Sequence, residues 1–121
     1  MSVRLSVVED KAGFRESLVL MLNNAPGFLC LYTYCSAAEA LQGIPGDPPD
    51  VVLMDINLPG MSGVECVRRL HTLVPPVRVI MLTVYENTEN IYAALKAGAS
   101  GYILKRTSPA KLLEAIQDVV D

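Results

Sequence analysis

The sequence predicts one α/β domain, residues 1–121, in which a parallel sheet carries helices on both faces. First, five short β-type runs alternate strictly with five helical patterns, which is typical of parallel strands joined by crossover helices. Second, Val51–Met54 is apolar at every position, as in a central strand covered on both faces. Third, 51% of the 121 residues are hydrophobic and 19% are charged, which suits a folded domain and excludes disorder.

The chain opens with a strand and an amphipathic helix. Val3–Val8 is rich in β-branched residues and ends at two acidic residues, Glu9 and Asp10. A helical pattern follows, and Pro26-Gly27 ends it. Its apolar residues recur at the spacing of one helix face, which predicts a side packed on the sheet. These residues are Phe14, Leu18, Met21, Leu22 and Ala25.

A second strand and a short helix come next. Phe28–Thr33 is another β-type run. Ser36–Glu39 has the pattern of a capping box, in which the serine and the glutamate satisfy backbone N–H groups at a helix start, so a helix begins there. Proline and glycine are dense over Gly43–Asp50, and we expect a loop there without any helix.

The second half of the chain continues the alternation. Val51–Met54 leads to Asp55, and Ser62–Glu65 is a second capping box that begins a helix with apolar residues at Val64, Val67, Leu70 and Leu73. The next elements are a strand Val77–Leu82 ending at Thr83, a helix Thr88–Ala97 closed by Gly98, and a strand Gly101–Leu104 ending at Lys105. A last helix is capped by Ser108 and has Pro109 at its first position. Its predicted buried stripe consists of Leu112, Leu113, Ile116 and Val119.

Charge and cysteine content exclude several classes of protein. Ten basic and 13 acidic residues give a net charge of −3, so we expect no nucleic acid to bind this chain itself. No apolar run reaches the roughly 18 residues of a membrane span, and the first residues do not resemble a signal peptide, so we expect no membrane association. Cys30, Cys35 and Cys66 lack metal-ligand spacing and are interpreted as reduced core thiols of a cytoplasmic protein.

Chemically active side chains follow four of the five predicted strands. In open α/β sheets the functional crevice lies beyond the carboxyl ends of the strands. Singly, each residue has an ordinary explanation: an aspartate forms a turn, a threonine caps a helix, a lysine lies on the surface. Their convergence on one edge is what indicates a site. The set is Glu9 and Asp10 after the first strand, Asp55 after the third, Thr83 after the fourth and Lys105 after the fifth.

The residue types in this set suit phosphoryl chemistry. Three neighbouring carboxylates repel one another, so one of them takes up a proton or a cation binds. Oxygen ligands favour a hard ion such as Mg²⁺ or Mn²⁺. Lys105 can pair with Asp55 or with an anion attached to it, and Thr83 can donate a hydrogen bond to a phosphoryl oxygen. Asp55 beside a cation and a lysine is a plausible acceptor for an aspartyl phosphate.

Nearly the whole chain resembles the receiver domain of bacterial two-component response regulators. The motifs that carry the resemblance are VVEDKAGFRESL, VVLMDINLPGMSGVECVRRL, VIMLTVYE and ALKAGASGYILKRTSPAKLLEAI, and the last two are most similar to NarL/LuxR-type regulators. The resemblance implies a doubly wound, flavodoxin-like (βα)5 three-layer sandwich with a five-stranded parallel sheet in the order 2-1-3-4-5.

The resemblance also implies a role for each site residue. Asp55 matches the phospho-acceptor, and Lys105 and Thr83 match the lysine and the hydroxyl residue that contact the phosphoryl group. Tyr102 matches an aromatic residue that swings inward when the hydroxyl moves. The implied metal ligands are Asp10, Asp55 and the backbone carbonyl of Asn57, with Glu9 helping indirectly.

The implied partners are a histidine kinase or a phosphotransfer protein, and a second copy of the chain through the face of the fourth helix, fifth strand and fifth helix. Such a domain is not a conventional enzyme, although it catalyses its own aspartyl phosphorylation and dephosphorylation. We expect it to control a DNA-binding output domain outside this chain. Tyr85 and Asn57 match positions that tune dephosphorylation in the family, and so set the lifetime of the phosphorylated state.

Two other functions remain open at this point. Val84 stands where many relatives carry alanine, and its larger side chain would narrow access to Asp55. This departure motivates a degenerate receiver that signals by partner binding, independently of phosphorylation. A small phosphatase or hydrolase is the third alternative, and the lack of a second acid two residues after Asp55 argues against it.

Overall fold

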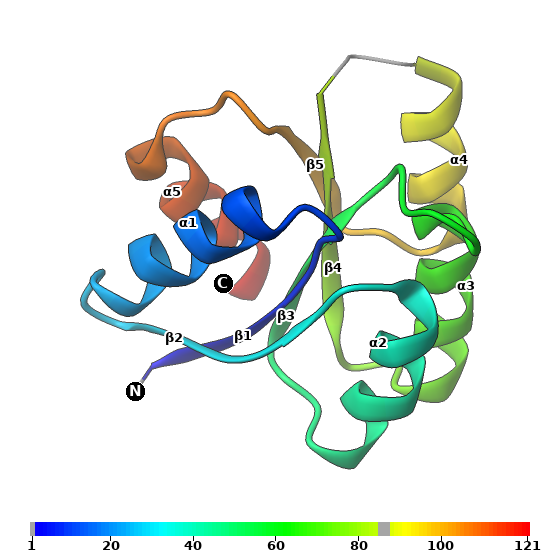
Figure 1. Ribbon diagram of the computed structural model, residues 1–121, viewed down its shortest axis with the longest axis horizontal. Coiled ribbons are helices and arrows are strands. Elements are labelled where there is room, and N and C mark those ends of the chain that lie inside the picture. The colour runs from blue at the N-terminus through cyan, green and yellow to red at the C-terminus, as the bar shows by residue number, and fades with distance from the viewer. Residues whose placement is uncertain (1, 85–87) are drawn as a thin grey trace.

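The computed structural model describes residues 2–84 and 88–121. Five parallel strands form one sheet in the order β2-β1-β3-β4-β5, which confirms the predicted topology. Figure 1 shows three layers, with α1 and α5 on one side of the sheet and α2, α3 and α4 on the other. The strands are β1 Val3–Val8, β2 Phe28–Tyr34, β3 Val51–Asp55, β4 Arg78–Thr83 and β5 Gly101–Leu104; the helices are α1 Ala12–Asn23, α2 Ala37–Gly43, α3 Gly63–Leu73, α4 Thr88–Ala97 and α5 Pro109–Val120.

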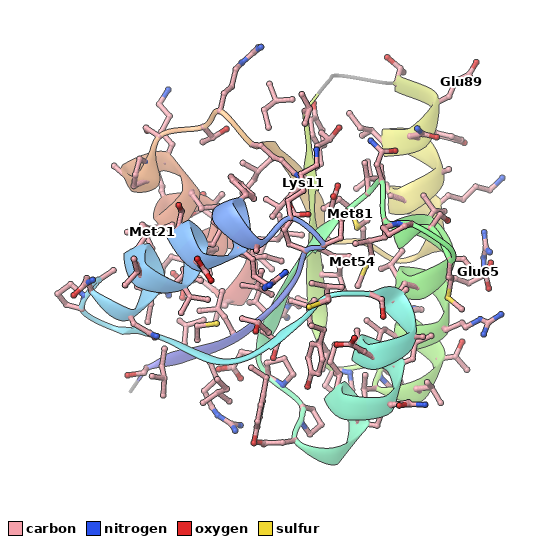
Figure 2. The ribbon with its side chains drawn as sticks, in the orientation of Figure 1. Lys11, Met21, Met54, Glu65, Met81 and Glu89 are labelled. Atoms are coloured by element: carbon pink, nitrogen blue, oxygen red, sulfur yellow. The ribbon has the colours of Figure 1, made fainter. Side chains whose placement is uncertain are left out.

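Two hydrophobic cores lie on the two faces of this sheet. All five residues of β3 are buried, as predicted for a covered central strand. Val51 and Leu53 belong to the core beneath α1 and α5, while Val52 and Met54 belong to the core beneath α2, α3 and α4. Figure 2 shows Met54 and Met81 on the side of the strands that faces α3, and Met21 on α1 at the opposite side. Because side chains alternate along β3, this one strand contributes residues to both cores.

The predicted capping boxes are half formed. The hydroxyl of Ser36 accepts a hydrogen bond from the N–H of Glu39, and the hydroxyl of Ser62 accepts one from the N–H of Glu65, so both serines cap their helices as expected. The return bond differs in each case. The carboxylate of Glu39 accepts from the N–H of Cys35, while that of Glu65 pairs with two arginines of α3, Arg68 and Arg69.

Three sequence-based expectations are wrong in detail. The segment after α2 is not a plain loop, because α2 continues through Gly43 and a 3₁₀ turn spans Ile44–Gly46. The buried side chain of Ile44 anchors this turn, and a proline is tolerated in a first helical turn. Leu73, the last residue of α3, is exposed, and Val74 packs against the core instead. Cys35 is exposed and is not a core thiol, whereas Cys66 is buried and Cys30 is half-buried against the core.

The carboxyl ends of the strands meet at one end of the sheet. The chain runs from β1 to β2 through α1 on one face of the sheet, and from β2 to β3 through α2 on the other face, so the strand order reverses at β1 and leaves a crevice there. The loops that leave β1, β3 and β5 lie at this end (Figure 1). In the part of the chain that is described, none of the helices has the length and apolar character needed to cross a bilayer.

Candidate functional site

Strand register brings the predicted site residues level with one another. Asp55 is the last residue of β3 and pairs with Leu82, and Thr83 is the last residue of β4 and pairs with Leu104. Glu9 directly follows β1, and Lys105 directly follows β5. The backbone N–H of Lys105 donates to the carbonyl of Thr83 at 2.8 Å, which joins the last two strand ends. Residues that are 96 positions apart in the sequence therefore share one edge of the sheet.

The three acidic residues form a compact cluster. One carboxylate oxygen from each of Glu9, Asp10 and Asp55 lies within 4.8 Å of the other two. Glu9 and Asp55 are buried and Asp10 is partly buried. Oδ1 of Asp10 is buried and has no hydrogen-bond partner among the described residues. An orphaned buried carboxylate oxygen beside two more carboxylates fits a hard divalent cation, so this donor set suits Mg²⁺ or Mn²⁺.

Lys105 reaches into this cluster from β5. Its Nζ lies 2.5 Å from Oε1 of Glu9 and 3.3 Å from Oδ2 of Asp55, and 12% of its side chain is exposed. The Phe14 ring centroid lies 4.9 Å from the same Nζ. The sequence predicted the pairing with Asp55, but the closer partner is Glu9. The extra methylene of a glutamate gives it the reach to meet the ammonium.

Burial and charge shift the pKa values of this pair. Burial raises the pKa of Glu9, and the negative charge of Asp55 raises it further, which together outweigh the opposing hydrogen bond from Lys105. Burial alone would lower the pKa of Lys105, but its hydrogen bond to Glu9 and the charge of Asp55 raise it above the usual value. Lys105 is therefore a firmly protonated cation, while Glu9 takes up a proton more readily than an ordinary glutamate.

Backbone contacts hold the turn that carries the first two acids. The N–H of Glu9 donates to the carbonyl of Tyr34 at 3.0 Å, and the guanidinium of Arg15 donates to the carbonyl of Glu9 at 2.8 Å. The N–H of Lys11 donates to the Glu9 carboxylate at 3.4 Å. Sequence reasoning did not identify Arg15. Its position one turn into the helix that follows the acids is the signal that could have suggested it.

The backbone around Asp55 is equally constrained. The N–H of Asn57 donates to Oδ1 of Asp55 at 3.0 Å, so the carboxylate braces the turn that follows β3. The Asn57 side chain is exposed, and the N–H of Ile56 donates to the carbonyl of Leu82 at 2.9 Å. Gly63 lies so close that a Cβ atom there would stand 2.4 Å from the Asp55 carbonyl oxygen. In the sequence Gly63 is only part of a capping pattern, which gives no sign of this contact.

The other two predicted residues differ in exposure. Thr83 is buried, with 3% of its surface exposed, at the end of β4. Tyr102 lies on β5 and is 42% exposed, so it stands outside the buried acid cluster. Val84 is also exposed. Tyr85, which the sequence analysis singled out, lies outside the described residues. The edge thus presents a largely buried acid cluster, a partly buried lysine and a buried hydroxyl residue, next to an exposed tyrosine.

Comparison with known protein families identifies one match over most of the chain. The profile described as "Response regulator receiver domain" matches residues 5–117. The chain is 33% identical over 117 residues to the transcriptional regulatory protein DegU of Brevibacillus brevis and 35% identical over 117 residues to the DNA-binding transcriptional activator DevR/DosR of Mycobacterium tuberculosis. Each match covers 97% of this chain, but only 50% and 54% of those proteins. The chain therefore spans about half the length of the curated relatives it matches.

Solved structures agree with the sequence comparison. The signal receiver domain of the putative response regulator NarL from Mycobacterium tuberculosis superposes with a TM-score of 0.93 at 29% identity, covering 98% of this chain and 96% of that one. A LuxR-family two-component response regulator from Aurantimonas also gives a TM-score of 0.93, at 30% identity, covering 99% of this chain and 86% of that one. Both agree with the predicted resemblance to NarL/LuxR-type receivers.

Proposed function

Because the chain belongs to the response regulator receiver domain family, we propose that it accepts a phosphoryl group on Asp55 and thereby switches an output surface. The observation that carries the proposal is the position of the Asp55 carboxylate. A protonated lysine lies 3.3 Å from it, and two further carboxylates in the same cluster suit a divalent cation. A phosphoryl group attached there would meet the positive charge of the lysine and that of a bound cation.

In this proposal the metal ligands are Asp10, Asp55 and the backbone carbonyl of Asn57, with Glu9 acting indirectly. Support comes from the carboxylate cluster and from the unpartnered Oδ1 of Asp10, as seen among the described residues. A bound Mg²⁺ or Mn²⁺ would offset the negative charge that gathers on the transferring group. Glu9 is fully buried, which fits a residue that influences the metal site through its charge and is not itself a direct ligand.

The donor would be a phosphohistidine of a histidine kinase or of a phosphotransfer protein. One Asp55 oxygen attacks phosphorus, a P–O bond forms, and the P–N bond to the imidazole breaks, so the electron pair leaves with the imidazole nitrogen. The Lys105 ammonium is placed to bind a phosphoryl oxygen, and the Thr83 hydroxyl to donate to another. Attack of water on the same phosphorus would release inorganic phosphate and restore Asp55. The domain would in this sense catalyse its own modification.

Phosphorylation would act by a population shift. The new group adds charge and acceptor oxygens at Asp55, so arrangements in which Thr83 and Lys105 bind it gain population. Tyr102, exposed in this structure, would turn inward as Thr83 moves toward the phosphate. Exposed apolar residues gather on the elements beside it, which supports homodimerisation through the α4–β5–α5 face; they are Tyr92 and Leu95 on α4 and Tyr102 on β5.

The relatives extend the proposal to the complete protein. DegU and DevR/DosR are a regulatory protein and a DNA-binding activator of transcription, and each is about twice as long as the matched segment. We propose that this receiver likewise controls a DNA-binding output domain, in the cytoplasm. The three free cysteines of the described residues agree with a reducing compartment.

Intact mass after incubation with acetyl phosphate tests the acceptor. We expect an adduct of one phosphoryl group that requires Mg²⁺ and is lost in Asp55→Asn. Asp118→Asn, an exposed aspartate on α5, is the matched control and should be modified like the wild type. An unmodified wild type would contradict the proposal and favour the phosphorylation-independent interaction module. In that case Asp55→Asn would bind its partner unchanged, and Val84→Ala would be the first reversion to make.

A further inference from the structure

We infer that Phe14 is a positioning residue for Lys105, and that the face of its ring keeps the ammonium where an incoming phosphoryl group would bind. The inference rests on the proposed function, because the role of Lys105 as a phosphoryl contact belongs to that proposal. Phe14 entered the sequence analysis only as one apolar residue of a helix face. The structure brings its ring beside the acid cluster instead of burying it wholly in the core.

The geometry is that of a cation–π contact. The Nζ of Lys105 lies 4.9 Å from the centroid of the Phe14 ring, inside the limit of about 6 Å at which the ring quadrupole attracts a cation. Only 12% of the lysine side chain is exposed. Water therefore screens the contact poorly, and a cation–π contact that is largely desolvated is stronger than one on the surface. Phe14 lies in the first turn of α1, directly after the turn that carries Glu9 and Asp10.

The ring supplies an attraction that the carboxylates cannot supply throughout a phosphorylation cycle. Glu9 and Asp55 attract the ammonium while both carry a free charge. A cation bound in the cluster would compete with Lys105 for these two carboxylates until a phosphoryl group on Asp55 adds new negative charge. The quadrupole of a benzene ring is unaffected by the binding of that cation. Phe14 would therefore keep Lys105 near Asp55 at the stage when its two ion pairs are weakest.

A neighbouring cavity explains why a long lysine needs this support. A cavity of about 150 Å³ lies between α1, β5 and α5, and Phe14 and Lys105 both line it, together with Leu18, Met21 and Leu112. A lysine stem has several rotatable bonds and a large rotamer entropy. If the ring were lost, the lysine stem would have room to move away from Asp55 into this cavity. Phe14 thus both attracts the ammonium and fills the space on this side of it.

The first experiment tests the contact without phosphorylation. A monofluorinated phenylalanine is built in at position 14, and its fluorine resonance is recorded in metal-free protein. We expect the resonance to shift when Lys105→Gln removes the charge, and to stay in place when Lys111→Gln removes an exposed charge on α5. A fluorine resonance that does not shift in Lys105→Gln would overturn the inference, whether or not the protein is phosphorylated by a phosphodonor.

The second experiment separates the electrostatic role from packing. Mono-, di- and trifluorinated phenylalanine nearly preserve the shape of the ring but weaken its attraction for a cation step by step. With acetyl phosphate and Mg²⁺, we expect the phosphorylation rate to fall progressively along the series at position 14, by roughly three- to tenfold at its end. The same series at Phe28, the second of the two phenylalanines in the chain, is the matched control and should leave the rate unchanged.

The outcomes distinguish this inference from the proposed function. A rate that stays constant along the position 14 series, in a protein that is phosphorylated, contradicts the role of Phe14 alone. A wild type that stays unmodified contradicts the proposed function, and that result is visible before any substitution is made. A rate that falls equally in both series indicates a general effect of fluorination and also contradicts the inference.

Discussion

Gly63 lies against Asp55 so closely that a Cβ atom at Gly63 would stand 2.4 Å from the Asp55 carbonyl oxygen and 2.9 Å from the Cα of Ile56. Gly63 is the first residue of α3, and its N–H donates to the carbonyl of Ile56 at 3.2 Å. The start of α3 therefore packs directly on the backbone that carries the proposed acceptor. Any side chain at this position would move that backbone.

Gly63→Ala should destabilise the fold. The new Cβ meets backbone atoms, which cannot rotate away, so we expect the free energy of unfolding to fall by about 2 kcal/mol. Gly13→Ala is the matched control, because nothing lies within 4 Å of a Cβ at this position in α1, and there alanine should stabilise the protein by up to about 1 kcal/mol. Urea unfolding of both variants measures the difference. Equal stability of Gly63→Ala and the wild type would contradict the close approach.

Lys105→Met should make stability depend on Mg²⁺. The substitution leaves the buried Glu9 and Asp55 carboxylates without their ammonium partner, and we expect the metal-free variant to lose about 2 kcal/mol of unfolding free energy. A divalent cation then replaces the lost positive charge, so Mg²⁺ should raise the melting temperature of the variant more than that of the wild type. Lys111→Met on α5 serves as the control. Equal stabilisation by Mg²⁺ in all three proteins would contradict this electrostatic account.

As the pH is lowered, the affinity for Mg²⁺ should begin to fall at a higher pH than it would if Glu9 had the pKa of an ordinary glutamate. Burial raises the pKa of Glu9 above 4.5, so protonation of Glu9 removes a negative charge beside the cation well before the pH falls to that value. The folded, metal-free protein then binds more protons than the unfolded chain between 4.5 and the raised pKa. Its stability consequently increases as the pH falls through that window.

Calorimetric titration of Mg²⁺ between about pH 7 and pH 5 measures this loss of affinity. In Glu9→Gln, whose side chain does not titrate, the loss of Mg²⁺ affinity at the higher pH values of this range should disappear. Lys105 has a raised pKa and stays protonated throughout this pH range, so it does not contribute to the pH dependence. An affinity that stays constant down to the range of an ordinary glutamate would be incompatible with the raised pKa of Glu9.

Ser6→Ala should stabilise the protein. The Ser6 side chain is fully buried in β1, and its hydroxyl has no hydrogen-bond partner within residues 2–84 and 88–121. Removing a buried, unsatisfied hydroxyl abolishes its desolvation cost, so we expect the unfolding free energy to rise by about 1 kcal/mol. Ser17→Ala, an exposed serine of α1, provides the comparison in the same urea experiment. A clear loss of stability in Ser6→Ala would reveal a partner for this hydroxyl.

Alkylation should distinguish Cys35 from Cys66. Cys35 is exposed, whereas burial raises the pKa of Cys66 to about 11. Because the thiolate is the reactive form, iodoacetamide at about pH 8 should modify Cys35 first and leave Cys66 unmodified in the folded protein. Peptide mass mapping identifies the modified residue, and Cys35→Ser should remove the fast adduct. Rapid modification of Cys66 without denaturant would contradict its burial.

Much of the fold follows from local patterns. Apolar periodicity and Pro-Gly breaks placed the five strands and five helices, and the serines at positions 36 and 62 cap their helices as predicted. The residues of the candidate site were predicted to lie together for a related reason. Parallel strands bring their carboxyl ends to one edge, so a residue that directly follows a strand is assigned to that edge without knowledge of any side-chain contact. The strand order itself came from the family resemblance, and hydrogen bonding in the sheet confirms it.

What the sequence determined by itself is therefore the alternation of elements, the buried central strand and the edge at which Glu9, Asp55 and Lys105 meet. Only the tertiary structure decided that Lys105 lies closer to Glu9 than to Asp55, that the Phe14 ring contacts the same ammonium, and that Cys35 is exposed. Periodicity specifies which face of an element a residue occupies. The distance between side chains separated by 96 positions depends instead on strand register, helix packing and side-chain reach, which no local pattern encodes.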